Sequence, residues 1–178
     1  MAEPGTLYAK ALYEMAEESA AEEKVLNELS DVAEILSGEP EYVRLADAYT
    51  LPAKQRAELL EEAFGGRVEE ILLNTMKLLA EKNAIHVLPQ CAKAYRKLFY
   101  DRHRITTAEI ASAVPLSEDQ KARLLSALEE KSGKHVLPKW ITDESLRGGI
   151  RIEMDGVAYD NTVSTKLTRL ARLLSNRT

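Results

Sequence analysis

The residues that could support catalysis or metal binding are few and scattered along the chain. His86, His103 and His135 fall in separate predicted elements, without the spacing of metal ligands. The single cysteine, Cys91, lies at the centre of a predicted apolar helix face, where a small core residue is expected. The sequence contains neither the phosphate loop that ends in Gly-Lys-Ser/Thr nor a Gly-x-Gly-x-x-Gly motif. We therefore expect no catalytic residues, no metal and no cofactor.

Four acidic residues gather near predicted turns: Asp143, Glu144, Asp155 and Asp160. Paired carboxylates can perform acid–base chemistry, so a small enzyme built on these turns is one alternative. Carboxylates at turns and helix starts more often accept hydrogen bonds from nearby backbone amides, and we interpret these four as structural. Trp140, the only tryptophan, is expected to pack in a core.

The composition is that of a soluble globular protein, with 45% apolar and 30% charged residues in 178. No apolar run approaches the roughly 18–20 residues needed to span a bilayer. The N-terminus is acidic and has no secretory signal, and one cysteine cannot form an internal disulfide. A cytosolic protein is therefore expected, and the net charge of −5 argues against a general nucleic-acid binder.

Charge is distributed unevenly between the two ends of the chain. Residues 1–41 carry 11 acidic and 2 basic residues, whereas residues 161–178 carry four basic residues and no acidic one. This asymmetry indicates either different partners at the two ends or solvated helix faces that differ in sign.

Helical spacing of apolar residues runs through the first hundred residues. The spacing, with its prolines and glycines, predicts six helices: one behind Pro4, one that carries Val25, Leu29, Val32 and Leu36 and stops at Gly38, and others over 41–48, 52–65, about 67–82 and about 84–102. The apolar face of the sixth helix comprises Leu88, Cys91, Ala92, Tyr95 and Phe99. Short connections between the helices favour a compact bundle.

The pattern changes near Arg104. Strands are predicted over 106–114, 135–142 and 150–154, and Asp155-Gly156 is a favoured hairpin turn into 157–159. A capping box of Ser117 and Gln120 begins a helix that Gly133 ends, and a last helix is predicted over about 162–174. The sequence thus predicts a mainly α protein with a small α/β part. A six-helix bundle at 1–104 precedes an α/β domain at 105–178 with a β-hairpin and a C-terminal helix.

Two helices carry features that a partner could use. The apolar residues of the fifth helix cover an arc of roughly 220° on a helical wheel, whereas one buried face needs little more than about 100°. Either its neighbours enclose this helix, or a second face meets a partner helix. The first helix is rich in small residues that admit a close helix, namely Ala9, Ala11, Ala16, Ala20 and Ala21.

Several strings along the chain resemble the delta subunit of bacterial F-type ATP synthases, the homologue of the mitochondrial oligomycin sensitivity-conferring protein. They keep the family's order over nearly the whole chain. The strings are LYAKALYEMA at 7–16, LPAKQRAELLEEAFGG at 51–66, LLNTMKLLAEK at 72–82, VLPQCAKAYRKL at 87–98, ASAVPLSEDQ at 111–120 and TDESLRGGIRIEMDGVAYDNTV at 142–163.

The resemblance implies a non-catalytic stator subunit at the cytoplasmic face of the bacterial inner membrane. In the family, the N-terminal bundle binds N-terminal segments of the alpha subunits of the catalytic head, and the C-terminal domain binds the b subunits of the peripheral stalk. The stalk resists rotor torque during proton-driven ATP synthesis. The expected alpha-binding residues are Tyr8, Ala11, Leu12, Leu72, Met76 and Leu79. The expected b-binding residues are Lys166, Leu167, Arg169, Leu170, Ala171 and Leu174.

Three alternatives remain open from the sequence. One is the small enzyme that uses the acidic turns. A second is a cytosolic helical adaptor unrelated to ATP synthase. A third is a membrane-surface protein anchored by its basic last helix, although that helix lacks the Trp and Phe common in interfacial helices.

Overall fold

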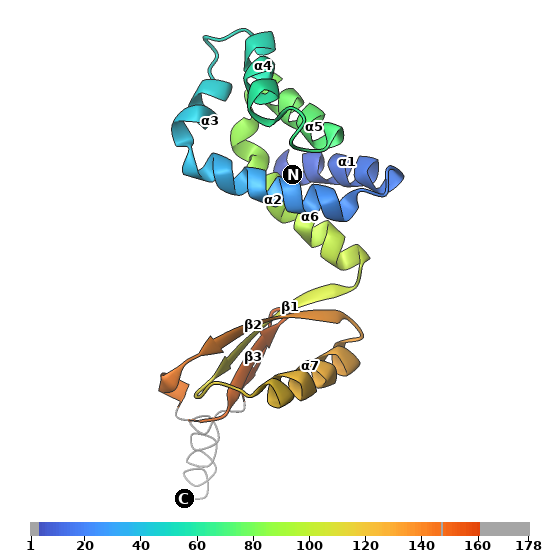
Figure 1. The fold of residues 1–178 in the computed structure, drawn as a ribbon, viewed down its shortest axis with the longest axis vertical. Coiled ribbons are helices and arrows are strands. Elements are labelled where there is room, and N and C mark those ends of the chain that lie inside the picture. Colours follow the sequence, from blue (N-terminus) through green and yellow to red (C-terminus); the bar gives the residue numbers. More distant parts are fainter. Residues whose placement is uncertain (1–3, 147, 161–178) are drawn as a thin grey trace, which may run out of the picture. The chain divides into compact units, whose positions relative to one another are not determined.

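The computed structural model describes residues 4–146 and 148–160 (Figure 1). Within these ranges the chain is mainly helical, with seven α-helices and a small mixed sheet of four strands. The chain divides into two compact units, Met1–Arg102 (unit 1) and His103–Thr178 (unit 2). No helix in the described ranges is long and apolar enough to cross a membrane.

Unit 1 carries the first six helices. Their bounds are α1 Pro4–Glu18, α2 Glu22–Gly38, α3 Pro40–Ala46, α4 Ala53–Phe64, α5 Glu70–Glu81 and α6 Leu88–Arg102. Proline opens α3, because a residue in the first turn needs no backbone N–H. Each of these helices matches a predicted one, and the two largest differences are at the starts of α5 and α6.

Helix α5 begins at Glu70, three residues later than predicted. The carboxylate of Glu28 on α2 accepts a hydrogen bond from the backbone N–H of Glu69 at 2.6 Å. This side chain from another helix therefore satisfies one of the free N–H groups at the start of α5.

Helix α6 begins at Leu88, four residues later than predicted. Residues 85–87 form a 3₁₀ turn, η1 Ile85–Val87, before the α-helix. The backbone N–H groups of Ile85 and His86 donate to the Asp47 carboxylate at 2.7 and 3.1 Å. Asp47 follows α3 directly, so its carboxylate ties the end of α3 to the start of the α6 segment.

The core of unit 1 includes an extensive contact between α1 and α6. Gly5 of α1 is buried there, and a Cβ at this position would lie only 2.7 Å from Gln90 Cβ. The rings of Tyr13 and Tyr95 meet with their centroids 5.4 Å apart. The predicted apolar face of the sixth helix is confirmed, since all five of its residues are buried.

Unit 2 contains a four-stranded sheet and one helix of the described residues. The elements are β1 Ile105–Ser112, α7 Glu118–Ser132, β2 His135–Thr142, β3 Ile150–Met154 and β4 Val157–Asp160, with a 3₁₀ turn, η2 Glu144–Leu146, before β3. The strand order is β2-β1-β3-β4. Strands β1 and β2 are parallel and joined through α7, whereas β3 is antiparallel to both β1 and β4.

The turn chemistry predicted for unit 2 is confirmed. The Ser117 hydroxyl accepts from the N–H of Gln120 at 3.3 Å, and the Gln120 side chain accepts from the N–H of Ser117 at 3.0 Å. Gly133 ends α7 in the left-handed region at φ 65°. Asp155 and Gly156 both have positive φ, as a tight hairpin turn between β3 and β4 requires. Strand β1 ends at Ser112, two residues earlier than predicted, where the Ser112 hydroxyl donates to the carbonyl of Val114.

Helix α7 covers one face of the sheet and closes the core of unit 2. The buried residues there are Ala108, Ile110, Leu128, Val136, Ile152 and Met154. Trp140 is partly buried against this cluster, as the sequence predicts. The ammonium group of Lys121 lies 5.8 Å from the centre of the Trp140 ring.

Candidate partner-docking surfaces

Burial separates the six residues of α1 and α5 that are predicted to bind a partner. Tyr8 is half-buried and Ala11 is exposed, so both can be reached from outside. The other four are at most 1% exposed and belong to the core of unit 1: Leu12, Leu72, Met76 and Leu79. Helices α1 and α5 contact each other. The four buried residues therefore pack beneath the exposed surface of these helices and do not themselves form part of that surface.

An apolar stripe on α1 remains outside the core. Leu7, Ala11 and Met15 recur every four residues and share one helix face. Leu7 is 66% exposed and Met15 45% exposed, and we name the three residues the α1 stripe. On α5, Leu78 is 44% exposed. Isolated exposed leucines are common on protein surfaces, but an aligned stripe is a candidate for contact with another chain.

The small residues of α1 are divided between the inside and the surface. Ala9 and Ala16 are fully buried, and Gly5 lies on the same side against α6. Ala11 and Ala20 are exposed, and Ala21 is half-buried. The buried small residues of α1 therefore allow α6 of the same chain to pack closely against it. On the α1 stripe, Ala11 is the one small residue.

A buried arginine, which the sequence pattern does not predict, fixes the end of α5. Arg56 of α4 is 4% exposed. Its guanidinium donates to the backbone carbonyls of Ala80 at 2.8 Å, Glu81 at 3.0 Å and Ala48 at 3.1 Å, and also to that of Leu51. No carboxylate of the described residues forms an ion pair with it. The partial negative charge at the C-terminus of α5 stabilises the buried cation, which joins α4, α5 and the α3–α4 connection.

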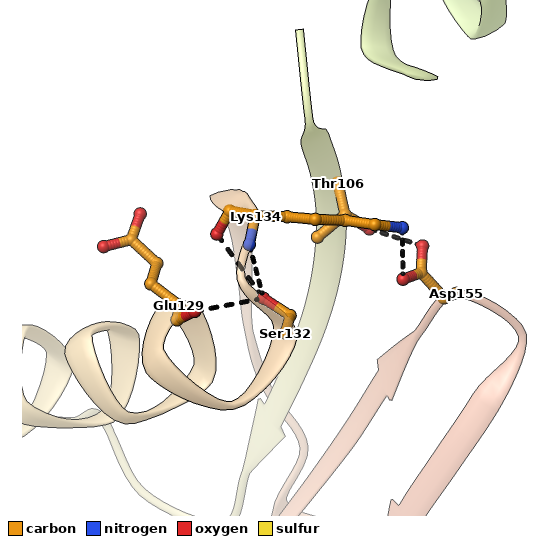
Figure 2. Close-up of polar contacts among 5 residues, drawn as sticks. All are labelled: Thr106, Glu129, Ser132, Lys134 and Asp155. Atoms are coloured by element: carbon orange, nitrogen blue, oxygen red, sulfur yellow. Dashed lines mark hydrogen bonds and ion pairs between the residues drawn. The ribbon is translucent and has the colours of Figure 1, made fainter. Parts of the chain in front are cut away.

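In unit 2, the carboxylate of Asp155 has a structural role, because it links the β3–β4 turn to strand β1 and to the turn after α7 (Figure 2). It accepts from the Thr106 hydroxyl at 2.7 Å and from the Lys134 ammonium at 2.9 Å. These two hydrogen bonds, the one from Lys134 first, lower the pKa of Asp155. The N–H of Lys134 donates to the Ser132 hydroxyl at 3.2 Å, which orders the turn that presents Lys134.

The other acidic turn residues are engaged at the opposite end of the sheet. Asp143 accepts from the hydroxyl of Ser145 at 2.6 Å and from its N–H at 3.0 Å, and these hydrogen bonds lower the pKa of Asp143. Asp160 lies 3.5 Å from the Arg151 guanidinium. Asp143 thus accepts from a nearby backbone amide, as predicted. Asp155 and Asp160 also have structural partners, but these are side chains of other elements rather than nearby amides.

The cysteine and two of the histidines have structural environments. Cys91 is fully buried, and burial raises the pKa of its thiol to about 12. The Nδ1 atom of His86 lies 2.6 Å from Asp47, and that of His135 lies 2.8 Å from Glu129. The described ranges contain no cluster of His, Cys, Asp and Glu that could hold a metal ion.

The predicted stalk-binding residues follow β4 in the sequence. Lys166, Leu167, Arg169, Leu170, Ala171 and Leu174 all lie outside the described residues, as does the predicted helix over 162–174. At the edge of the described sheet, Val157 and Tyr159 of β4 are 49% and 39% exposed. The ammonium of Lys131 lies 4.4 Å from the centre of the Tyr159 ring.

Comparisons with known proteins agree over nearly the full chain. The family model of the ATP synthase delta (OSCP) subunit matches residues 6–174. An ATP synthase subunit delta of Clostridium perfringens is 32% identical over 170 residues, covering 96% of this chain and 95% of the relative. That of Halalkalibacterium halodurans is 32% identical over 168 residues, covering 94% and 92%.

Solved structures show the same fold at lower identity. A chain of the Toxoplasma gondii mitochondrial ATP synthase hexamer aligns with a TM-score of 0.63 and 20% identity, covering 97% of this chain and 98% of that one. A chain of the Polytomella F-ATP synthase aligns with a TM-score of 0.52 and 21% identity, covering 57% and 90%.

These matches define the class first: a structural, non-catalytic component of the peripheral stalk of F-type ATP synthases. More particularly, the chain belongs to the ATP synthase delta (OSCP) subunit family. This assignment excludes the small enzyme, the unrelated adaptor and the membrane-surface protein as readings of the sequence.

Proposed function

We propose that residues 1–104 act as a helix-bundle domain that binds the N-terminal segment of an alpha subunit, and that residues 105–178 act as an α/β domain that binds the b subunits of the peripheral stalk. In this role the chain links the catalytic head to the stalk at the cytoplasmic face of the membrane and resists rotor torque. The division of the chain into two compact units near residue 102 supports two separate tasks. The observation that carries the head contact is the α1 stripe.

The alpha segment is proposed to lie along α1 and α5. Its apolar residues would contact Leu7, Ala11, Met15 and Leu78, with Tyr8 at the edge. The buried side chains of Leu12, Leu72, Met76 and Leu79 support these contacts from the core. Residues 1–41 have a net charge of −9, which attracts a basic segment and speeds its encounter with the chain. Association is therefore expected to slow as salt is added.

Binding of a peptide from the alpha N-terminus tests this contact. Substitutions Leu7→Glu and Ala11→Glu place a charge in the stripe without disturbing a buried residue. Loss of an aliphatic anchor at an interface costs about 1–3 kcal/mol, roughly 5- to 150-fold in affinity. Leu45→Glu on α3 is the matched control, because Leu45 is 45% exposed and lies outside the stripe. Equal affinity for all three variants and the parent would show that the alpha segment binds elsewhere.

The stalk contact is proposed to involve residues 162–178, with Lys166, Leu167, Arg169, Leu170, Ala171 and Leu174 as its contacts. Deletion of this segment is expected to abolish b-subunit binding and to leave alpha-peptide binding unchanged. Trp140 fluorescence serves as the folding control, because Trp140 packs against the core of unit 2. A folded deletion variant that still binds the b subunits would refute the proposal.

A further inference from the structure

The hairpin turn between β3 and β4 contains the one Asp-Gly pair of the sequence, Asp155-Gly156. An aspartate that precedes glycine can isomerise spontaneously, because the glycine has no side chain to hinder attack by its nitrogen on the aspartate carboxyl group. Both residues are exposed, and a Cβ added at Gly156 would have no atom within 4 Å. The surroundings of the turn therefore leave room for this reaction, and water is its only co-reactant.

The isomerisation proceeds through a cyclic intermediate. The backbone nitrogen of Gly156 attacks Cγ of the protonated Asp155 carboxyl group, and a five-membered succinimide ring forms. The carboxyl hydroxyl leaves as water together with the proton of that nitrogen. A water molecule then adds to one of the two ring carbonyls. Attack at the side-chain carbonyl restores aspartate, whereas attack at the backbone carbonyl breaks the original peptide bond and leaves isoaspartate, in which the main chain runs through Cγ.

Two hydrogen bonds in the folded chain oppose this reaction. Oδ1 of Asp155 accepts from the Thr106 hydroxyl at 2.7 Å, and Oδ2 accepts from the Lys134 ammonium at 2.9 Å. Figure 2 shows the carboxylate turned toward these two donors, which belong to β1 and to the turn after α7. Loss of water requires a protonated carboxyl group, whereas both hydrogen bonds favour the ionised form. We name Thr106 and Lys134 the Asp155 clamp.

We infer that Asp155-Gly156 is a site of isoaspartate formation and that the Asp155 clamp controls its rate. Isoaspartate adds one carbon to the main chain of a turn that the Met154–Val157 pair closes directly. Strand β4 lies at the edge of the sheet and pairs with β3 alone among the described strands. The modification is therefore expected to loosen β4, which leads into residues 161–178. The inference does not depend on the proposed alpha and b contacts.

Incubation of the folded, full-length chain at about pH 5 tests the inference, since a small fraction of an ordinary aspartate is protonated there. Trypsin releases residues 152–166 as one peptide, in which isoaspartate at position 155 is separated by chromatography and identified by fragmentation. Thr106→Val removes the hydroxyl at nearly constant shape, and Thr106→Ser keeps it. The valine variant is expected to form isoaspartate about two- to tenfold faster than the parent, from the loss of one hydrogen bond. The serine variant is expected to react at the rate of the parent.

The second donor has its own matched pair. Lys134→Met removes the ammonium group that Asp155 accepts from, whereas Lys139→Met removes a cation that pairs with Glu109 at 2.9 Å. Lys134→Met is expected to accelerate isoaspartate formation about two- to fivefold, as befits a half-exposed ion pair, and Lys139→Met to leave the rate unchanged. In urea, where the clamp is absent, all chains are expected to react at one common and faster rate.

Trp140 fluorescence confirms that each variant is folded, and the lysine pair carries the test if Thr106→Val fails to fold. Equal rates for the valine and serine variants, both folded, would overturn control by the clamp, as would equal acceleration by the two lysine variants. A folded parent that reacts as fast as the chain in urea would overturn it too. Absence of isoaspartate at position 155 from every chain, including those in urea, would overturn the site itself.

Discussion

Gly5→Ala probes the closest contact between α1 and α6. An added Cβ would lie 2.7 Å from Gln90 Cβ and 3.0 Å from the backbone nitrogen of Cys91. The second contact is with backbone, so a change of rotamer cannot relieve it and the two helices must move apart. Overpacking a core costs about 1–3 kcal/mol, and the helix preference of alanine over glycine returns up to about 1 kcal/mol. We expect the free energy of unfolding to fall by about 1–2 kcal/mol.

Gly38→Ala is the matched control for this substitution. Gly38 ends α2, and a Cβ there would have no atom within 4 Å. Its φ lies outside the left-handed region, so alanine fits its backbone without strain. The same chemical change is therefore expected to be neutral or to stabilise the protein by about 0.4–1 kcal/mol, through the unfolded chain.

Urea titration with two probes assigns the effect to one unit. Far-UV circular dichroism follows mainly the helices of unit 1, whereas fluorescence of Trp140, the only tryptophan, follows unit 2. Gly5→Ala is expected to lower the midpoint of the circular dichroism transition and to leave the fluorescence transition unchanged. If the Gly5 and Gly38 variants are equally stable, the α1–α6 contact is not as tight as the structure indicates.

Three further predictions follow from buried or hydrogen-bonded groups. Arg56→Met removes the donor from four backbone carbonyls and is expected to lower the free energy of unfolding by about 2–4 kcal/mol in a urea titration; Gln55→Met, at an exposed neighbour, should change it by less than about 0.5 kcal/mol. Cys91 is expected to resist thiol reagents near neutral pH until urea unfolds unit 1, because burial raises its pKa to about 12; rapid labelling of the native chain would contradict this. Asp155 has a folded-state pKa below 3.8, so its stabilisation is present above that pH and is lost as the pH falls through the folded-state pKa. We therefore expect the parent and Asp155→Asn to differ in the stability of unit 2 at neutral pH and to become equally stable below pH 3.8, as followed by Trp140 fluorescence. A difference in stability that persists in acid would show that the carboxylate charge is not its source.

Local signals in the sequence were sufficient for most elements of the fold. The capping box of Ser117 and Gln120 joins two residues that are three apart in the sequence, so its formation does not depend on distant parts of the chain. The hairpin at Asp155-Gly156 likewise depends on backbone preferences within the turn itself. Features of this kind can be predicted from one sequence, since cause and effect lie within a few residues.

Features that depend on distant residues could not be predicted in the same way. At the start of α5, the backbone N–H of Glu69 donates to Glu28, which lies 41 residues earlier in the chain. In the sequence, Arg56 cannot be told from an arginine on the polar face of an amphipathic helix. The carbonyls of Ala80 and Glu81 come within hydrogen-bond distance of it only in the folded chain. Side-chain to backbone contacts across elements leave no periodic signal, so they become visible only when the helices are placed.

The wide apolar arc of α5 had two interpretations, and the structure favours enclosure for most of it. Leu72, Met76 and Leu79 are fully buried, and α5 contacts α4, α1 and η1. Of its large apolar residues, Leu78 is the one exposed by more than a third in the described chain. A partner that relied on α5 alone would therefore find little apolar surface. The larger exposed area lies on α1, where Leu7 and Met15 flank Ala11, so substitutions on the α1 stripe are expected to weaken docking more than Leu78→Ala does.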